Sequence, residues 1–231
     1  MEDRGQTLLI DADDTLWENN IYFEEIVSHY VEVVGRYGHS AETARATLLE
    51  IEHRRTKHHG YGIDNFRHSL GDACAQLLDG HDYHHELTRF DDLCFTLRRR
   101  PIALLPEVDD TLRVLGGRHR LILLTKGDSD DQLAKVVRSG IRHRFHAVDV
   151  VMEKDVATYE DVIRRHGVDR ARGWMVGNSP KSDILPALAV GLRTVFVPHA
   201  ATWQLELLEL PKIDEARMLV LQRFADLTRH F

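Results

Sequence analysis

Several polar side chains directly follow short apolar runs of the sequence, and together they have the donor and acceptor types that phosphoryl transfer needs. They are Asp11 and Asp13 after residues 7–10, Thr125 after 121–124, Lys154 after 147–151, and Asn178, Ser179 and Asp183 after 174–176. If the runs are parallel strands, their carboxyl ends meet at one edge of a sheet, where loops and helix N-termini converge. The sequence therefore predicts one polar site built from four loops.

These side chains have complementary chemical roles in such a site. Asp11 can attack a phosphoryl group and form an aspartyl-phosphate, which divides one difficult step into two easier ones. Asp13 can protonate the leaving oxygen and then deprotonate the attacking water. Thr125 can donate a hydrogen bond to the phosphoryl group, and Lys154 can offset negative charge on the nucleophile and the phosphoryl oxygens. We therefore expect four catalytic residues: Asp11, Asp13, Thr125 and Lys154.

The crowded carboxylates of this site repel one another and need a cation. Mg²⁺ favours oxygen ligands and usually also binds phosphate oxygens of a substrate. We expect Mg²⁺ as the cofactor, held by Asp11, by Asp183 and by the backbone carbonyl of Asp13. Asn178 is expected in the outer shell of the ion, because an amide oxygen can hold a metal-bound water but brings no charge.

The pattern of the whole chain predicts the elements that position these residues. A further apolar run lies at 194–197, and amphipathic stretches at 131–139 and 159–166 are each followed by a glycine, Gly140 and Gly167. Glycine just after the last periodic residue is a common signal for the end of a helix. Alternating strands and helices predict an α/β fold with a doubly wound, Rossmann-like parallel sheet.

A long insertion interrupts this alternation after the first strand. Its apolar faces predict consecutive helices over residues 21–34, 40–51, 64–78 and 83–99. Pro101 then marks the return to the sheet. We expect a core domain of residues 1–18 and 101–231 and an inserted all-helical domain of residues 19–100.

The polar loops resemble the four motifs of the haloacid dehalogenase (HAD) superfamily. The segments that carry the resemblance are Asp11-Ala12-Asp13-Asp14-Thr15, 121–125, Glu153-Lys154 with the following helix, and 177–184, in the family's order. The resemblance implies a HAD-like core in which residues 19–100 form the C1 cap, which shields the site and carries much of the substrate selection. The fourth motif often has an acidic residue where this chain has Asn178.

The resemblance also indicates the reaction. Haloacid dehalogenases lack the second aspartate of the first motif, so Asp13 favours a Mg²⁺-dependent phosphatase that acts on a small phosphorylated metabolite. The sequence Asp-Ala-Asp-Asp-Thr-Leu is also similar to the first motif of pyrimidine 5′-nucleotidases, which makes a nucleoside 5′-monophosphatase the main alternative. A phosphomutase, a phospho-acceptor switch and a binding protein without turnover are further alternatives.

Basic side chains outside the four motifs are candidates for substrate contact. Arg54 and His58 are expected near a loop at Gly60 and Gly62 between two helices of the insertion. Seven histidines between residues 53 and 85 of the insertion have no metal-ligand spacing, and we expect them to be solvated. The predicted substrate-binding residues are Thr125, Lys126, Arg54 and His58.

Three lysines compete for the ammonium role beside the nucleophile. Lys126 follows Thr125, Lys154 follows the third apolar run, and Lys181 lies in the fourth motif. Lys154 is favoured because it lies between a strand and the start of a helix.

Composition limits the remaining function classes. The chain has 231 residues, 43% of them hydrophobic, with 30 Lys+Arg against 37 Asp+Glu, a net charge of −7. These values are typical of a globular protein with a substantial core, and the negative balance disfavours a nucleic-acid partner. No segment has the ~18 uninterrupted apolar residues of a membrane span, and no signal peptide is visible. We expect a cytoplasmic monomer or homodimer with no membrane partner, in which Cys74 and Cys94 are buried free thiols.

Overall fold

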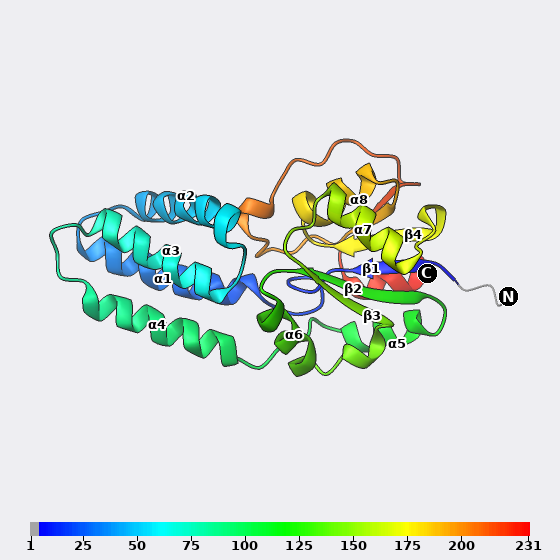
Figure 1. Cartoon of the computed structure of the whole chain (residues 1–231), viewed down its shortest axis with the longest axis horizontal. Coiled ribbons are helices and arrows are strands. Elements are labelled where there is room, and N and C mark those ends of the chain that lie inside the picture. Colours follow the sequence, from blue (N-terminus) through cyan, green and yellow to red (C-terminus); the bar gives the residue numbers. More distant parts are fainter. Residues whose placement is uncertain (1–4) are drawn as a thin grey trace. The chain divides into compact units, whose positions relative to one another are not determined.

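The computed structural model describes residues 5–231, and its contacts divide the chain into two compact units (Figure 1). Unit 1 consists of the chain up to Asn20 together with Ile102–Phe231, and unit 2 is Ile21–Pro101. These breaks lie within two residues of the predicted domain boundaries, 18/19 and 100/101. The role of unit 2 as a cap stays a prediction.

Unit 1 is built around a parallel sheet, as predicted, and this sheet has six strands. The strands are β1 (Thr7–Ile10), β2 (Arg120–Lys126), β3 (Ala147–Val151), β4 (Gly173–Gly177), β5 (Arg193–Phe196) and β6 (Met218–Val220). Their order is β3-β2-β1-β4-β5-β6, the order of a doubly wound Rossmann-like sheet. The direction of winding reverses between β1 and β4, so the crevice at the carboxyl ends of these two strands is the expected ligand site.

Helices cover both faces of this sheet, which explains why the central strands are continuous apolar runs. The longer helices of unit 1 are α5 (Val108–Gly116), α6 (Ser129–Arg138), α7 (Val156–His166) and α8 (Leu185–Ala189). Short 3₁₀ turns lie at Arg142–Arg144, Arg170–Arg172, Gln204–Glu206 and Phe224–Arg229, and a π-helical turn at Pro180–Ile184. The glycine signal for α7 holds, because Gly167 is left-handed (φ 58°) and its N–H bonds to the carbonyls of Ile163 and Arg164.

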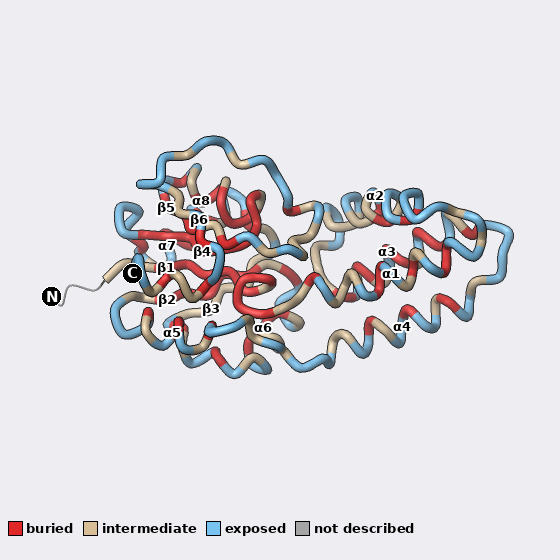
Figure 2. Tube along the Cα trace, turned by 180° about the vertical axis from the view of Figure 1, so that it is seen from behind, coloured by how far each residue is buried: buried red, intermediate tan, exposed pale blue. Residues whose placement is uncertain are grey.

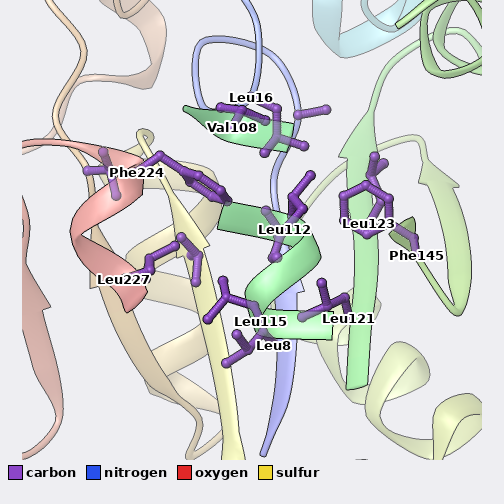
Figure 3. Close-up of a cluster of buried hydrophobic side chains, with 14 of the residues drawn as sticks. Leu8, Leu16, Val108, Leu112, Leu115, Leu121, Leu123, Phe145, Phe224 and Leu227 are labelled. Atoms are coloured by element: carbon purple, nitrogen blue, oxygen red, sulfur yellow. The ribbon is translucent and has the colours of Figure 1, made fainter. Parts of the chain in front are cut away.

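Alternate residues of β1 pack into two separate cores. Leu8 and Ile10 face a cluster with Leu112 and Leu115 of α5 (Figure 3), whereas Leu9 faces a cluster formed with α7 and β4. Because both faces of β1 are apolar and buried, its register is fixed and the loop after Ile10 leaves the sheet at a defined point.

Two details of unit 1 differ from the sequence expectation. α5 follows Pro106 as a helix that the strand–helix pattern did not reveal, since it is short and begins after Glu107, a residue with a left-handed backbone (φ 63°). β3 is only partly buried along its length, because it is an edge strand and one side of its backbone lacks a neighbouring strand.

Unit 2 is all helical, as the periodicity predicts. Its helices are α1 (Asn20–Arg36), α2 (Ala41–His59), α3 (Ile63–Leu77) and α4 (His84–Arg99). Figure 2 shows buried residues recurring along these helices at helical spacing, and they form a core of their own around Tyr30, Leu70 and Phe90. Cys74 and Cys94 are buried free thiols in that core, as expected. Among residues 5–231 no helix is long and apolar enough to cross a membrane.

Candidate active site

The polar loops after β1, β3 and β4 meet beside the point where the sheet reverses its direction. The N–H of Asp11 bonds to the carbonyl of Val176 in β4 (2.9 Å), which holds the residue after β1 against the neighbouring strand. Lys154 Nζ lies 2.5 Å from Asp11 Oδ1 and 2.7 Å from Asp183 Oδ1. One buried ammonium therefore bridges two buried carboxylates that are 172 positions apart in the sequence.

The electrostatics of this trio leave negative charge uncompensated. Burial and the neighbouring Asp183 carboxylate raise the pKa of Asp11 to about 7, although the Lys154 ammonium acts to lower it. Burial also disfavours the charged form of Lys154, but the two carboxylates outweigh it and raise its pKa. Two carboxylates with one ammonium carry a net negative charge, and their oxygens are the ligand type that Mg²⁺ favours. The donor set therefore fits a divalent cation.

The turn after β4 holds Asp183 in place. Asp183 Oδ2 accepts a hydrogen bond from the N–H of Ser179 (2.9 Å), and its carboxylate lies directly against Gly177. A Cβ at Gly177 would lie only 2.2 Å from Asp183 Oδ2. Glycine at the end of β4 is thus a steric requirement for this carboxylate.

Asp13 lies in a separate environment although it is two residues from Asp11. Lys135 Nζ lies 2.8 and 2.7 Å from its two carboxylate oxygens. Gln132 Nε2 donates to Oδ2 (2.9 Å) and Trp17 Nε1 to Oδ1 (2.7 Å). Burial acts to raise the pKa of Asp13, but the Lys135 ammonium and these hydrogen bonds outweigh it, so its pKa lies below the ordinary value.

Asn178 and Thr125 complete the predicted residues at this edge. Asn178 is buried; its Oδ1 lies 3.3 Å from the hydroxyl of Thr15, and its Nδ2 donates to Thr202 Oγ1 (2.9 Å). The same Thr15 hydroxyl lies 2.9 Å from Asp11 Oδ2, so it connects the first and fourth motifs. Thr125 is buried near the carboxyl end of β2.

The three competing lysines have different partners. Lys154 contacts Asp11, whereas Lys126 Nζ bonds to Glu206 (2.7 Å), Glu153 (3.2 Å) and Ser182 (2.8 Å). Lys181 lies 3.6 Å from Glu206. Substrate binding by Lys126 stays a prediction, and its ammonium has protein partners in this structure.

Glu206 is a residue that the sequence did not single out. Its Oε2 accepts hydrogen bonds from Ser179 (2.6 Å) and Ser182 (2.5 Å), and Oε1 pairs with Lys126. Burial acts to raise its pKa, but these partners keep the pKa below the ordinary value. Glu206 therefore ties the 3₁₀ turn Gln204–Glu206 to the loop that carries Asp183. It has no motif and no neighbouring signal in the sequence.

Asp14 belongs to the first motif but was given no role of its own, and it shapes the loop after β1. It has a left-handed backbone (φ 59°), and its Oδ1 accepts from the N–H groups of Asn19 and Asn20 (2.9 and 3.0 Å). Its carboxylate lies beside Glu18 and His199, whose ligand atoms all lie within 4.8 Å of one another. His199 Nδ1 accepts from the N–H of Ala201, and Nε2 faces Glu18 (3.2 Å).

Arg54 and His58 lie in unit 2 and are exposed. The expected loop at Gly60 and Gly62 lies between α2 and α3, but α2 continues through His59, so both residues belong to its last turns. Contact of these two residues with a substrate stays a prediction.

A family comparison covers most of the chain described above. The model of the haloacid dehalogenase-like hydrolases matches residues 6–191, a range that contains all four polar loops. The chain belongs to this family. The HAD superfamily predicted from the motifs is therefore confirmed.

Curated relatives of this HAD hydrolase match it over part of its length. It is 34% identical over 103 residues (42% of this chain, 46% of the relative) to glyceraldehyde 3-phosphate phosphatase of Methanothermobacter thermautotrophicus. It is 31% identical over 109 residues (45% and 44%) to phosphoserine phosphatase of Thermus thermophilus. The matched segments thus span about half the length of each relative.

A solved structure supports the same architecture over the whole chain. The haloacid dehalogenase-like family hydrolase of Xanthomonas campestris superposes with a TM-score of 0.86 at 24% identity, covering 100% of this HAD hydrolase and 92% of the other chain. At that identity the likeness concerns the fold alone.

Proposed function

We propose that the protein is a Mg²⁺-dependent phosphatase that hydrolyses a small phosphorylated metabolite through an aspartyl-phosphate. The observation that carries this proposal is the contact of Lys154 with both Asp11 and Asp183 at the reversal point of the sheet. A buried carboxylate next to an ammonium is a suitable nucleophile, because the cation offsets charge on carboxylate and phosphoryl oxygens together.

The reaction proceeds in two displacements. An oxygen of Asp11 attacks phosphorus, the ester P–O bond breaks, and the leaving oxygen takes a proton from Asp13. A water then attacks phosphorus of the aspartyl-phosphate and gives a proton to Asp13, which releases inorganic phosphate and regenerates the Asp11 carboxylate. Lys154 stabilises negative charge in both steps, and Thr125 donates a hydrogen bond to the phosphoryl group.

Asp11, Asp183 and the backbone carbonyl of Asp13 would hold Mg²⁺, with Asn178 in its outer shell. The ion would neutralise phosphoryl oxygens and the excess charge of the two carboxylates. Lys126, Arg54 and His58 are the further proposed substrate contacts. The proposed site is otherwise complete within unit 1.

The substrate class rests on the relatives and on the first motif. Both curated relatives are named as phosphatases of small phosphorylated molecules, glyceraldehyde 3-phosphate and phosphoserine. The resemblance of Asp11-Ala12-Asp13-Asp14-Thr15 to pyrimidine 5′-nucleotidases keeps nucleoside 5′-monophosphates as the second candidate.

A hydrolysis screen tests the proposal. Purified protein is assayed for phosphate release from sugar phosphates, phosphoamino acids and nucleoside monophosphates, with Mg²⁺ and with a chelator, and Asp11→Asn serves as the control. We expect Mg²⁺-dependent turnover that the variant lacks. Turnover restricted to nucleotides favours the second candidate, and turnover of no ester contradicts the proposal.

A further inference from the structure

The cradle around Asp13 is the part of the site that the four motifs do not explain. Three side chains donate four N–H···O contacts to one carboxylate: two from Lys135 and one each from Gln132 and Trp17. Both oxygens of this carboxylate are thus held by protein donors. Lys135 Nζ also bonds to Asn19 Oδ1 (2.8 Å).

The local fold builds this cradle on rigid elements. Gln132 and Lys135 are three residues apart on α6 and therefore lie on the same face of the helix. Asp128 caps α6 by accepting from the N–H groups of Asp130 and Asp131 (3.0 Å each). Gly127 precedes this cap with φ 141°, and a Cβ there would lie 3.0 Å from Gln132 Nε2.

The position of Gln132 is fixed from both sides. Its Nε2 donates to Asp13 Oδ2 and to the carbonyl of Lys126 (3.1 Å), while its side chain is buried. Trp17 is fully buried and donates its indole N–H to Asp13. The donors thus have little freedom to follow Asp13 if it moves.

We propose that Lys135 is a positioning residue for Asp13. Together with Gln132 and Trp17, it holds the Asp13 carboxylate in the orientation from which Asp13 exchanges a proton with the leaving group. The inference rests on the proposed phosphatase function. The ammonium of Lys135 bonds to Asp13 and to Asn19, and we assign its effect on the reaction to the Asp13 carboxylate. Loss of Lys135 therefore affects the step that needs a proton donor and leaves the attack by Asp11 intact.

The leaving group of the substrate distinguishes a loss of proton donation by Asp13 from a loss of attack by Asp11. Phenyl phosphate and 4-nitrophenyl phosphate have similar shapes, but phenolate is the more basic leaving group and gains more from a general acid. The ratio kcat/KM covers only the steps up to departure of the phenol, so later hydrolysis of the aspartyl-phosphate does not mask the difference.

The test compares kcat/KM for both esters in the wild type, Lys135→Met, Asp13→Asn and the double variant, with Mg²⁺ present. We expect Lys135→Met to lower kcat/KM about tenfold or more for phenyl phosphate and less than about threefold for 4-nitrophenyl phosphate. In the Asp13→Asn background the same change has no further effect, because the two residues act as one unit. Lys135→Arg recovers most of the loss, and Lys212→Met, a lysine change outside the site, leaves both values unchanged.

Other outcomes are decisive as well. Equal losses on both esters, or losses that multiply with those of Asp13→Asn, overturn the positioning role and indicate a general structural one. If Lys135→Met does not fold, Gln132→Glu, which places a second carboxylate against Asp13, gives the same comparison. A wild type that hydrolyses neither ester overturns the phosphatase function, and the inference with it.

Discussion

Asp11 and Asp13 are separated by one residue, yet their environments differ in kind. Asp11 shares one ammonium with Asp183, and burial raises its pKa to about 7. Asp13 pairs with the Lys135 ammonium, which also bonds to the amide oxygen of Asn19, and the pKa of Asp13 is lowered against the effect of burial. Two residues of the same type are thus held by different partners and have pKa values shifted in opposite directions.

The largest expected effect comes from the nucleophile side of this comparison. Asp11→Asn removes the attacking carboxylate and should lower kcat by about a thousandfold or more. Asp13→Asn should retain more activity on 4-nitrophenyl phosphate, because that leaving group needs little proton donation. Steady-state assays of both variants measure the contrast, and equal losses on this ester would show that the two aspartates do not have separate roles.

The second prediction concerns stability. Lys154→Met leaves two buried carboxylates without their cation and should lower the free energy of unfolding by about 3–5 kcal/mol in the absence of Mg²⁺. Lys135→Met removes the cation from one carboxylate, that of Asp13, which is 21% exposed. This change should lower the free energy of unfolding by about 1–3 kcal/mol. Urea unfolding of both variants at neutral pH tests the order. A larger loss for Lys135→Met would contradict the account of the two environments.

A third prediction uses the steric contact behind Asp183. The added methyl of Gly177→Ala would overlap the Asp183 carboxylate, so the Asp11 side of the site should be displaced. We expect weaker Mg²⁺ binding by calorimetry and a loss of turnover of about tenfold or more. Gly35→Ala, in open space on α1, is the matched control. Unchanged Mg²⁺ binding in Gly177→Ala would indicate that Asp183 is not a ligand.

The smallest expected effect is a pH dependence of stability from Glu206, which supports the loop of Asp183. Its folded-state pKa lies below the ordinary value of 4.5, so the folded protein binds protons less readily than the unfolded chain. The contribution is present above pH 4.5 and is lost as the pH falls through the folded pKa. Glu206→Gln should lower stability at neutral pH and flatten the acid limb of the unfolding curve. If the stability of Glu206→Gln falls with decreasing pH as steeply as that of the wild type, groups other than Glu206 cause the pH dependence.

The sequence was informative where residues follow a strong local pattern. The runs at 7–10 and 147–151 coincide with β1 and β3. A short run rich in β-branched and aliphatic residues, followed by polar residues, is typical of a strand in a parallel sheet. The residues expected at the carboxyl ends of the strands lie there because parallel topology fixes that edge. Lys154, favoured from its position alone, is the lysine that contacts Asp11.

The residues that were missed act through distant contacts. The side chains of Lys135 and Glu206 bond to Asp13 and Lys126, which lie 122 and 80 positions away in the chain. A single sequence does not encode such pairs in spacing or periodicity. The loop at Gly60 and Gly62 lies where the sequence predicts it, but α2 extends through His59, beyond the predicted helix of residues 40–51, and includes Arg54 and His58.

The central claim is that Asp11 forms a covalent phosphoryl intermediate. It is tested most directly by mixing the protein with a substrate from the screen, quenching with acid within the first turnover and locating the phosphoryl group by peptide mass spectrometry. The account predicts a phosphorylated peptide in which Asp11 carries the group, and no such peptide from Asp11→Asn. Phosphoryl transfer to another residue, or full turnover by Asp11→Asn, would contradict it.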